Sequence, residues 1–240
     1  MGYLQSLVLP LVLLAGDHAD STKVSVDVEL VLAADTSSSM DVEERQAQVD
    51  GYANAFRDGA LIARLLSGPT GRIAVTYVEW SEEQRVIVPW TLISNVHEAE
   101  RFAAAIADAP VYRDPHGTNL TGALAFSAAA LRLNHFDGRR SVIDISGDGE
   151  NNFPFPPDPV RDAIVQEGIT INGLSLELRE DEKVDWRNEP TASYYAAHVI
   201  GGPGAFLVSV YGMGAFEEAL KRKLALEVLA GSDQSLPVRL

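Results

Sequence analysis

"VSVDVELVLAADTSSSMD", residues 24–41, is the stretch of sequence that decides the fold. It begins with alternating apolar and polar residues, then becomes a continuous apolar run that ends at Asp35. A strand has this pattern when it enters a sheet that is covered on both faces, as parallel sheets are. Asp41 stands where a helix N-cap is expected, with Glu43 and Glu44 in the first turn. The stretch therefore predicts a buried strand, a hydroxyl-rich turn and a helix.

Apolar strands and helical segments alternate along the rest of the chain. Further strands are predicted at 72–80, 82–93, 139–146, 169–178 and 205–210. Helices are predicted at 42–66 with a break near Gly59, and at 96–110, 120–134, 159–168, 191–202 and 214–231. Pro89 has no backbone donor, which favours an edge position or a strand end for residues 82–93. The alternation predicts an α/β fold with three αβα layers around a doubly wound, mostly parallel sheet of about six strands.

Length and composition limit the class of protein. The chain has 240 residues, 46% of them hydrophobic, and no internal repeat or second core, so we expect one domain at 24–231. Its net charge of −15, without a Lys/Arg cluster, argues against nucleic-acid binding because such a surface repels phosphates. The absence of cysteine excludes disulfides and thiolate metal sites. The five histidines show no H-x-x-x-H spacing, so a zinc site is not expected.

The N-terminus carries the apolar segment "LQSLVLPLVLLAG", residues 4–16. Its length is that of a signal-peptide core and is too short for a typical membrane-spanning helix. Residues 1–20 are therefore predicted to be a signal peptide, with a periplasmic or secreted mature protein. The alternative is a buried first strand or helix. No other apolar run is long enough to span a membrane, and residues 232–240 are predicted to form a flexible tail.

Three polar stretches are predicted to meet at one edge of the sheet. Asp35 ends the first strand, Asp148 follows the fourth, and Thr118 begins the helix that leads into the fourth. Ligands of such sheets bind at the carboxyl ends of the strands. Ser37 and Ser39 follow Asp35 at the spacing that puts alternate side chains on one side of an extended turn. Carboxylate and hydroxyl oxygens suit Mg²⁺ or another hard divalent cation.

These stretches also carry a family resemblance. "DTSSS" (35–39), "GTNLTGAL" (117–124) and "SGDGENN" (146–152) resemble the metal-ion-dependent adhesion site of von Willebrand factor type A domains. The order of strands and helices resembles that family from Val24 to Gly231. The stretches "VIDISGDGENN", "ITINGLSL" and "GGPGAF" are similar to an exported bacterial group of type A domain proteins of unassigned function.

The resemblance implies a set of metal ligands and a function. The residues that match the family's site are Asp35, Ser37, Ser39, Thr118 and Asp148. It implies Mg²⁺, or else Mn²⁺ or Ca²⁺, and a non-enzymatic, protein-binding role. A partner's Asp or Glu side chain would complete the coordination of the cation. The alternative is a metal-dependent hydrolase that activates water for phosphoester cleavage at the same oxygens.

Other interpretations of the same residues remain open in the sequence. Residues 35–39 also fit a helix N-cap with spare serines. Asp144, inside the fourth strand, competes with Asp148, and as a buried acid it must be paired, either orienting the site or bonding a backbone group. Thr121 competes with Thr118, which we favour because Gly117 precedes it.

Two further motifs are weighed and set aside, and two loop features are interpreted. A dehalogenase-type phosphatase needs a second aspartate where this chain has Ser37. "GGPGAF", 201–206, is expected to be a turn and not an oxyanion loop, because the chain has no G-x-S-x-G nucleophile elbow. His116 is expected to be an exposed loop residue. The loop 153–159, "FPFPPDP", is a candidate docking surface beside the metal loop.

Overall fold

The computed structural model describes residues 23–110, 117–177 and 190–229. The segments predicted as a signal peptide (1–20) and a flexible tail (232–240) lie outside the described residues, as does His116. Those predictions therefore stay predictions. Within the described ranges, no helix has the length and apolar character needed to cross a membrane.

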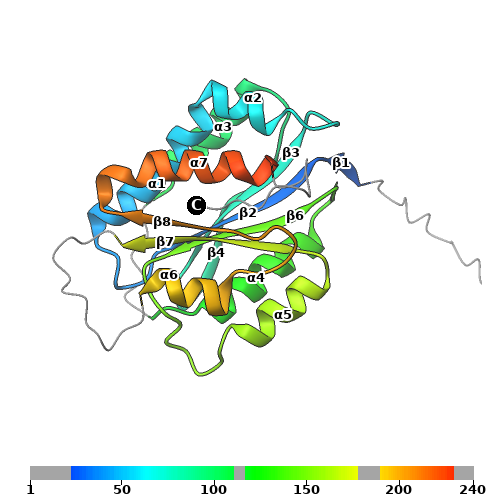
Figure 1. Cartoon of the computed structure of the whole chain (residues 1–240). Helices are drawn as coiled ribbons and strands as arrows, with labels where there is room; N and C mark the ends of the chain where they lie inside the picture. Colours follow the sequence, from blue (N-terminus) through cyan, green and yellow to red (C-terminus); the bar gives the residue numbers. More distant parts are fainter. Residues whose placement is uncertain (1–22, 111–116, 178–189, 230–240) are drawn as a thin grey trace, which may run out of the picture.

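A six-stranded sheet forms the centre of the molecule (Figure 1). Its strands lie in the order β4-β3-β2-β6-β7-β8, and every neighbouring pair is parallel except β3 and β4. The bounds are β2 (Val28–Asp35), β3 (Ile73–Trp80), β4 (Gln84–Ile93), β6 (Ser141–Gly147), β7 (Thr170–Glu177) and β8 (Leu207–Tyr211). Pro89 lies in β4, an edge strand, as predicted.

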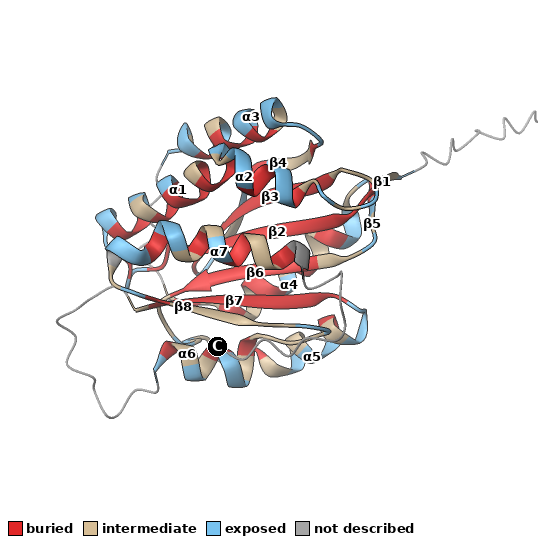
Figure 2. Cartoon of the chain, turned by 45° about the horizontal axis from the view of Figure 1, so that its top comes forward, coloured by how far each residue is buried: buried red, intermediate tan, exposed pale blue. Residues whose placement is uncertain are grey.

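Helices cover both faces of the sheet, which confirms the predicted three-layer fold. One face carries α1 (Val42–Arg57), α2 (Gly59–Leu65), α3 (Val96–Ala107) and α7 (Phe216–Leu229). The other carries α4 (Leu120–Leu133), α5 (Asp158–Gln166), the short α6 (Thr191–Tyr194) and the π-helix η1 (Tyr195–Val199). A 3₁₀ turn, η2 (Met213–Ala215), precedes α7. Figure 2 shows the central strands as the most deeply buried layer.

Side-chain caps explain where the helices begin. Asp41 and Glu44 form a capping box at the start of α1, as the sequence predicted. Asp58 accepts from the first amides of α2 and so produces the expected break near Gly59. The expectation that Thr118 begins a helix is wrong by a short distance: Asn119 is the cap of α4, and the helix starts at Leu120. Asn119 can accept from Gly122 N–H at 2.8 Å, which leaves Thr118 in the preceding loop.

A short parallel ribbon was not predicted. It pairs β1 (Val24–Val26) with β5 (Phe136–Gly138), and strands of three residues are too short for a reliable sequence pattern. The buried Glu29 carboxylate fixes this corner, because it accepts from Gly138 N–H at 2.6 Å and from the Asn134 amide at 2.5 Å. The ribbon lies outside the main sheet and leaves its strand order unchanged.

The chain reverses its direction of travel across the sheet between β2 and β6. From β2 it continues outward to β3 and β4, whereas β6 continues to β7 and β8 on the other side. In such sheets, ligands bind at the carboxyl ends of the strands where the chain reverses in this way. Asp35 ends β2 at this position and Gly147 ends β6. The fold therefore brings the two predicted metal loops next to each other.

Candidate metal centre

Asp35 is fully buried at the end of β2. Its Oδ1 accepts from Ser37 N–H at 2.7 Å, and its backbone carbonyl accepts from the Gln48 side chain of α1 at 2.8 Å. Its second oxygen, Oδ2, is buried and has no hydrogen-bond partner among the described residues. A buried carboxylate oxygen without a donor is costly, so the position favours an additional ligand at Oδ2.

The two serines connect Asp35 to the distant loop after β6. Ser37 is buried, and its Oγ lies 3.0 Å from Ser39 Oγ. Ser39 Oγ in turn donates to Asp148 Oδ1 at 2.7 Å, a contact between residues 109 positions apart in the chain. The extended turn therefore does place Ser37 and Ser39 on one side, as their spacing predicted. Four of the five predicted ligands form one continuous set of contacts.

Thr118 is fixed against the same loop by its backbone. Its N–H donates to Asn152 Oδ1 at 2.8 Å, and its carbonyl accepts from Asn152 N–H at 3.0 Å. Its Oγ1 lies 4.0 Å from the point where a Cβ on Gly149 would be, which puts the hydroxyl beside the residue that follows Asp148. Gly117 is required here, because a Cβ would lie 2.4 Å from Asn152 Oδ1. All five predicted residues thus lie at the same rim of the sheet.

The carboxylate of Asp35 is electrostatically unusual. Burial, with the nearby charge of Asp148, raises the pKa of Asp35 to about 8. None of the ion pairs among the described residues includes Asp35. A divalent cation would remove both the repulsion and the cost of the buried oxygen.

The donor set fits a hard cation. It consists of carboxylate and hydroxyl oxygens, the ligands of Mg²⁺, Mn²⁺ and Ca²⁺. Within the part of the chain that the structure describes, no group of three or more His, Asp or Glu side chains is arranged for a metal. Any cation at the rim would therefore rely on two carboxylates and on neutral hydroxyls.

Tyr195 is a site residue that the sequence did not reveal. Its hydroxyl lies 2.4 Å, and Asp35 Oδ2 lies 2.8 Å, from the point where a Cβ on Gly147 would be. The hydroxyl is buried without a hydrogen-bond partner in the described ranges, and burial with the Asp35 charge raises its pKa well above the usual value. Tyr195 belongs to a π-helix, a rare element that often occurs at functional sites. The sequence indicated only a tyrosine pair in a short helix.

The two residues that the sequence offered as alternatives to Asp148 and Thr118 make other contacts. Asp144 is paired as expected, but with Lys223 inside the core and not at the rim. Thr121 donates to the Phe155 carbonyl at 2.6 Å, so it holds the 153–159 loop beside the site. In that loop the Phe155 side chain is 74% exposed.

Gly202 and Gly204 have positive φ angles, which agrees with the expected turn at 201–206.

The fold is that of a von Willebrand factor type A domain. Proximal thread matrix protein 1 from the mussel byssus, in a structure described as having a zinc occupied MIDAS motif, has 14% identity and a TM-score of 0.59. This likeness covers 87% of the present chain and 47% of that one, so the chain spans less than half of the byssus protein's length. BatB from Bacteroides thetaiotaomicron has 16% identity and a TM-score of 0.54, with 84% of this chain and 98% of that chain covered.

A second bacterial structure agrees with this class. The type A domain from Catenulispora acidiphila has 15% identity and a TM-score of 0.56, over 84% of this chain and 42% of that chain. Within this class, the chain belongs to the family described as "Protein of unknown function (DUF1194)", which matches residues 25–232. No curated protein matches the chain.

Proposed function

We propose that this protein binds a divalent cation at the rim and, through it, an acidic side chain of a protein partner. The ligands would be Asp35, Ser37, Ser39, Thr118 and Asp148, and the cation Mg²⁺, or else Mn²⁺ or Ca²⁺. The observation that carries the proposal is the buried, unpartnered Oδ2 of Asp35 beside Asp148, joined to it through two serine hydroxyls.

The low charge of the ligand set favours an acidic partner. Two carboxylates balance the charge of one divalent cation, and hydroxyls add none. The bound cation would supply an electrophilic centre that accepts another carboxylate oxygen. The chain's own residues do the positioning: Ser37 N–H holds the Asp35 carboxylate, and Ser39 holds Asp148. A partner Asp or Glu is the simplest group that meets this demand.

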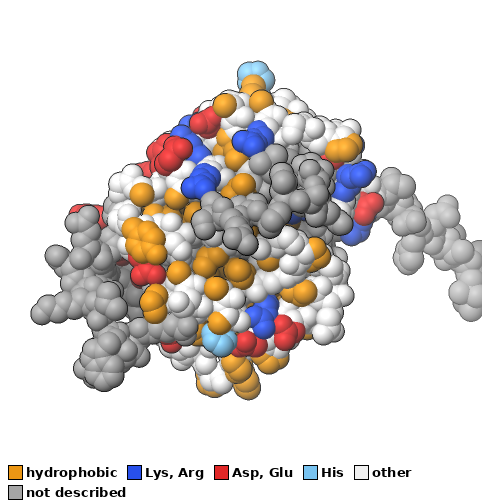
Figure 3. Space-filling view, viewed as in Figure 1, with side chains coloured by type: hydrophobic (Ala, Val, Ile, Leu, Met, Phe, Trp, Pro, Cys, Tyr) orange, Lys and Arg blue, Asp and Glu red, His pale blue; other side chains and the backbone are white. Residues whose placement is uncertain are grey.

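The surroundings of the site support protein binding and not nucleic-acid binding. Figure 3 shows acidic and basic side chains interspersed on the described part of one face, with no continuous basic area. A solved relative in fold is described as a pilus adhesin, SpaC from Lactobacillus rhamnosus GG, with 14% identity and a TM-score of 0.57 over 85% of this chain and 30% of that one. The apolar residues 4–16 support an exported, periplasmic or secreted location.

Calorimetry with the metal alone tests the first half of the proposal. Titration of Mg²⁺ into the full chain should show binding that Asp148→Ala and Ser37→Ala remove. Thr118→Ala should weaken it, whereas the matched control Thr121→Ala should not, because Thr121 bonds the Phe155 carbonyl. Absence of Mg²⁺, Mn²⁺ and Ca²⁺ binding to the folded protein would contradict the proposal.

A pull-down tests the second half. The partner should be captured with Mg²⁺ and released by EDTA, and capture should fail when the contacted Asp or Glu of the partner becomes Asn or Gln. Full capture by the Asp35→Ala protein would contradict a metal-dependent role. Metal-dependent turnover of a generic phosphoester would instead favour the hydrolase function and overturn the assignment as a non-enzymatic binding protein.

A further inference from the structure

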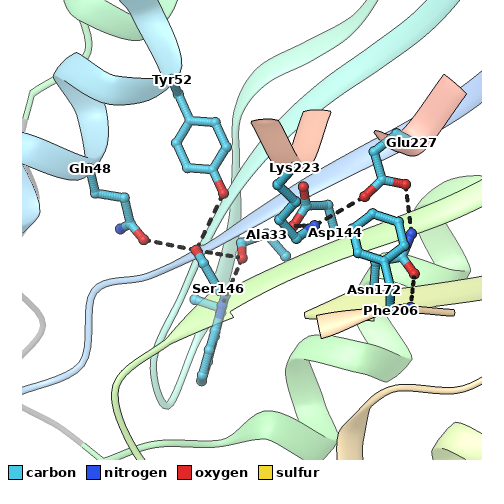
Figure 4. Close-up of polar contacts among 10 residues, drawn as sticks. Ala33, Gln48, Tyr52, Asp144, Ser146, Asn172, Phe206, Lys223 and Glu227 are labelled. Carbon is cyan, nitrogen blue, oxygen red and sulfur yellow. Dashed lines mark hydrogen bonds and ion pairs between the residues drawn. The ribbon is translucent and has the colours of Figure 1, made fainter. Parts of the chain in front are cut away.

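Three ionisable side chains meet in the core between β6 and α7 (Figure 4). Lys223 Nζ lies 2.5 Å from Asp144 Oδ1 and 3.0 Å from Glu227 Oε1. The side chains of Lys223 and Asp144 have no exposed surface, and that of Glu227 has 1%. A lysine and two acids are almost never buried this completely in an ordinary core.

The ion pair between Lys223 and Asp144 leaves one carboxylate oxygen without a partner. Lys223 Nζ contacts Asp144 Oδ1 at 2.5 Å, whereas Oδ2 is buried and has no hydrogen-bond partner in the described part of the chain. A buried ion pair offsets its desolvation only when its geometry is excellent and its remaining oxygens are bonded. Oδ2 has no such bond, so the ion pair leaves part of the desolvation cost of Asp144 uncompensated. A covalent bond between the two groups would remove both charges from the core.

From this geometry we propose that Lys223 and Asp144 become joined by an intramolecular amide bond, with Glu227 relaying the proton. One proton passes from the Lys223 ammonium to the Asp144 carboxylate, which leaves a neutral amine and a carboxylic acid. The amine attacks Cγ, and the Nζ–Cγ bond forms. Glu227 passes a second proton from the nitrogen to the leaving hydroxyl, the Cγ–OH bond breaks, and one water molecule departs. Ammonium and carboxylate thus become amide and water, without oxidant or co-reactant.

The electrostatics of the pocket favour the neutral acids that the reaction needs but also favour the charged form of Lys223. Burial raises the pKa of Asp144 and of Glu227, so both carboxyls are driven toward their neutral forms. Burial also acts to lower the pKa of Lys223, but the two neighbouring carboxylates outweigh it and hold that pKa above its usual value. With Glu227 protonated the triad is neutral overall, and the proton transfer between Lys223 and Asp144 then removes both remaining charges from a dry pocket.

Two neighbours hold the triad in place. Asn172 donates to Glu227 Oε2 at 2.6 Å and accepts from the Phe206 N–H at 2.9 Å, which orients the proposed proton relay. The Phe206 ring lies 5.4 Å from Lys223 Nζ and covers the amine. Exclusion of water matters here, because amide formation releases water.

Peptide mass spectrometry of the full chain, purified under denaturing conditions, tests the bond directly. After trypsin digestion, the peptide that begins at Ser141 should be joined to the peptide that contains Lys223, at their summed mass less one water molecule. Trypsin should fail to cleave after Lys223, because an amide-linked lysine is no longer a substrate. A wild-type digest with free Ser141 peptide and full cleavage after Lys223 would overturn the proposal.

Variants assign the roles. Lys223→Arg should give only separate peptides, and Glu227→Gln should lose most of the linked species although the lysine and aspartate remain. Lys221→Arg is the matched control: Lys221 lies on the same helix, pairs with Glu217 at 2.8 Å near the surface, and should leave the cross-link intact. Full cross-linking of Glu227→Gln would remove Glu227 from the mechanism, and a wild-type link at Lys221 would contradict the assignment to Lys223.

Discussion

Asp144 and Asp148 lie four positions apart in the sequence, but the first is in the core and the second is at the rim of the sheet. Asp144 points into the core, where Lys223 of the same chain lies 2.5 Å away. Asp148 lies at the rim, where its charge helps to raise the pKa of Asp35, and we propose that a cation from solution binds there. The core cluster finds its partners within the chain, whereas the rim is the proposed site of an external ligand. The role of an acid on β6 thus depends on what lies opposite its carboxyl group.

The largest expected effect breaks the core cluster. Lys223→Met should lower the free energy of unfolding by about 3–5 kcal/mol at pH 7, because two buried carboxyls lose Lys223 as their partner. Urea denaturation followed by circular dichroism measures this. Lys221→Met, which removes the ion pairs with Glu217 and Asp58 near the surface, should change stability by at most about 1 kcal/mol. Equal losses in the two variants would show that the buried cluster has no special role.

Glu79 is a buried acid outside both clusters, so it tests how burial alone makes stability depend on pH. Burial raises its pKa from 4.5 to about 7, against the opposing effects of Arg85 and Arg45. The folded state therefore holds the proton more tightly than the unfolded state. Glu79 contributes its full stability below about pH 4.5 and loses it as pH rises through 7. Between pH 4 and pH 8 the wild type should lose about 3 kcal/mol more than Glu79→Gln. Parallel pH profiles of unfolding would contradict this assignment.

Metal addition sharpens the comparison at the rim. At a Mg²⁺ concentration one hundred times the Kd, wild-type stability should increase by about 2.7 kcal/mol, whereas the core cluster should not respond. Asp148→Asn should abolish that gain. In EDTA the same variant should be at least as stable as the wild type, because Asp35 loses a repelling neighbour. Thermal unfolding with and without Mg²⁺ measures both effects, and a large loss of stability in EDTA would argue that Asp148 is structural.

The smallest expected effect concerns Tyr195. Tyr195→Phe should weaken Mg²⁺ binding by about 1 kcal/mol, the typical contribution of one hydrogen bond, if the hydroxyl acts beside Asp35 Oδ2. Metal-free stability should stay unchanged, because the hydroxyl has no hydrogen-bond partner within the described ranges. Calorimetry and unfolding in EDTA separate the two effects. Lower stability with unchanged affinity would identify Tyr195 as a core residue only.

The sequence was most informative where a strand ends. Asp35 and the loop of Asp148 follow apolar runs of the kind that form central parallel strands, and such strands finish at one edge of a sheet. The fold class, the edge position of Pro89 and the Asp41 cap followed from equally local patterns. The predicted start of the helix at Thr118 was wrong, because Asn119 provides the cap and the helix begins at Leu120.

The sequence was least informative about contacts between distant elements. Lys223 follows Lys221 and Arg222 in a helix, and nothing in this local pattern indicates that Lys223 faces Asp144. Tyr195 reaches Asp35 only because a π-helix and the absent side chain of Gly147 leave it room. Both depend on how α7 and η1 pack across the sheet, which local periodicity does not specify.

The position of β6 has a mechanical consequence. A tensile load applied by a partner at Asp148 would enter the chain at the tip of β6, which is paired in register with β2 and β7 on its two sides. Pulled along its own axis, the strand resists by shear of both ladders at once. Asp144 on the same strand also ties it to α7 through Lys223, so the load reaches the C-terminal helix as well. The end of β6 is thus held against a pulling force by β2, β7 and α7.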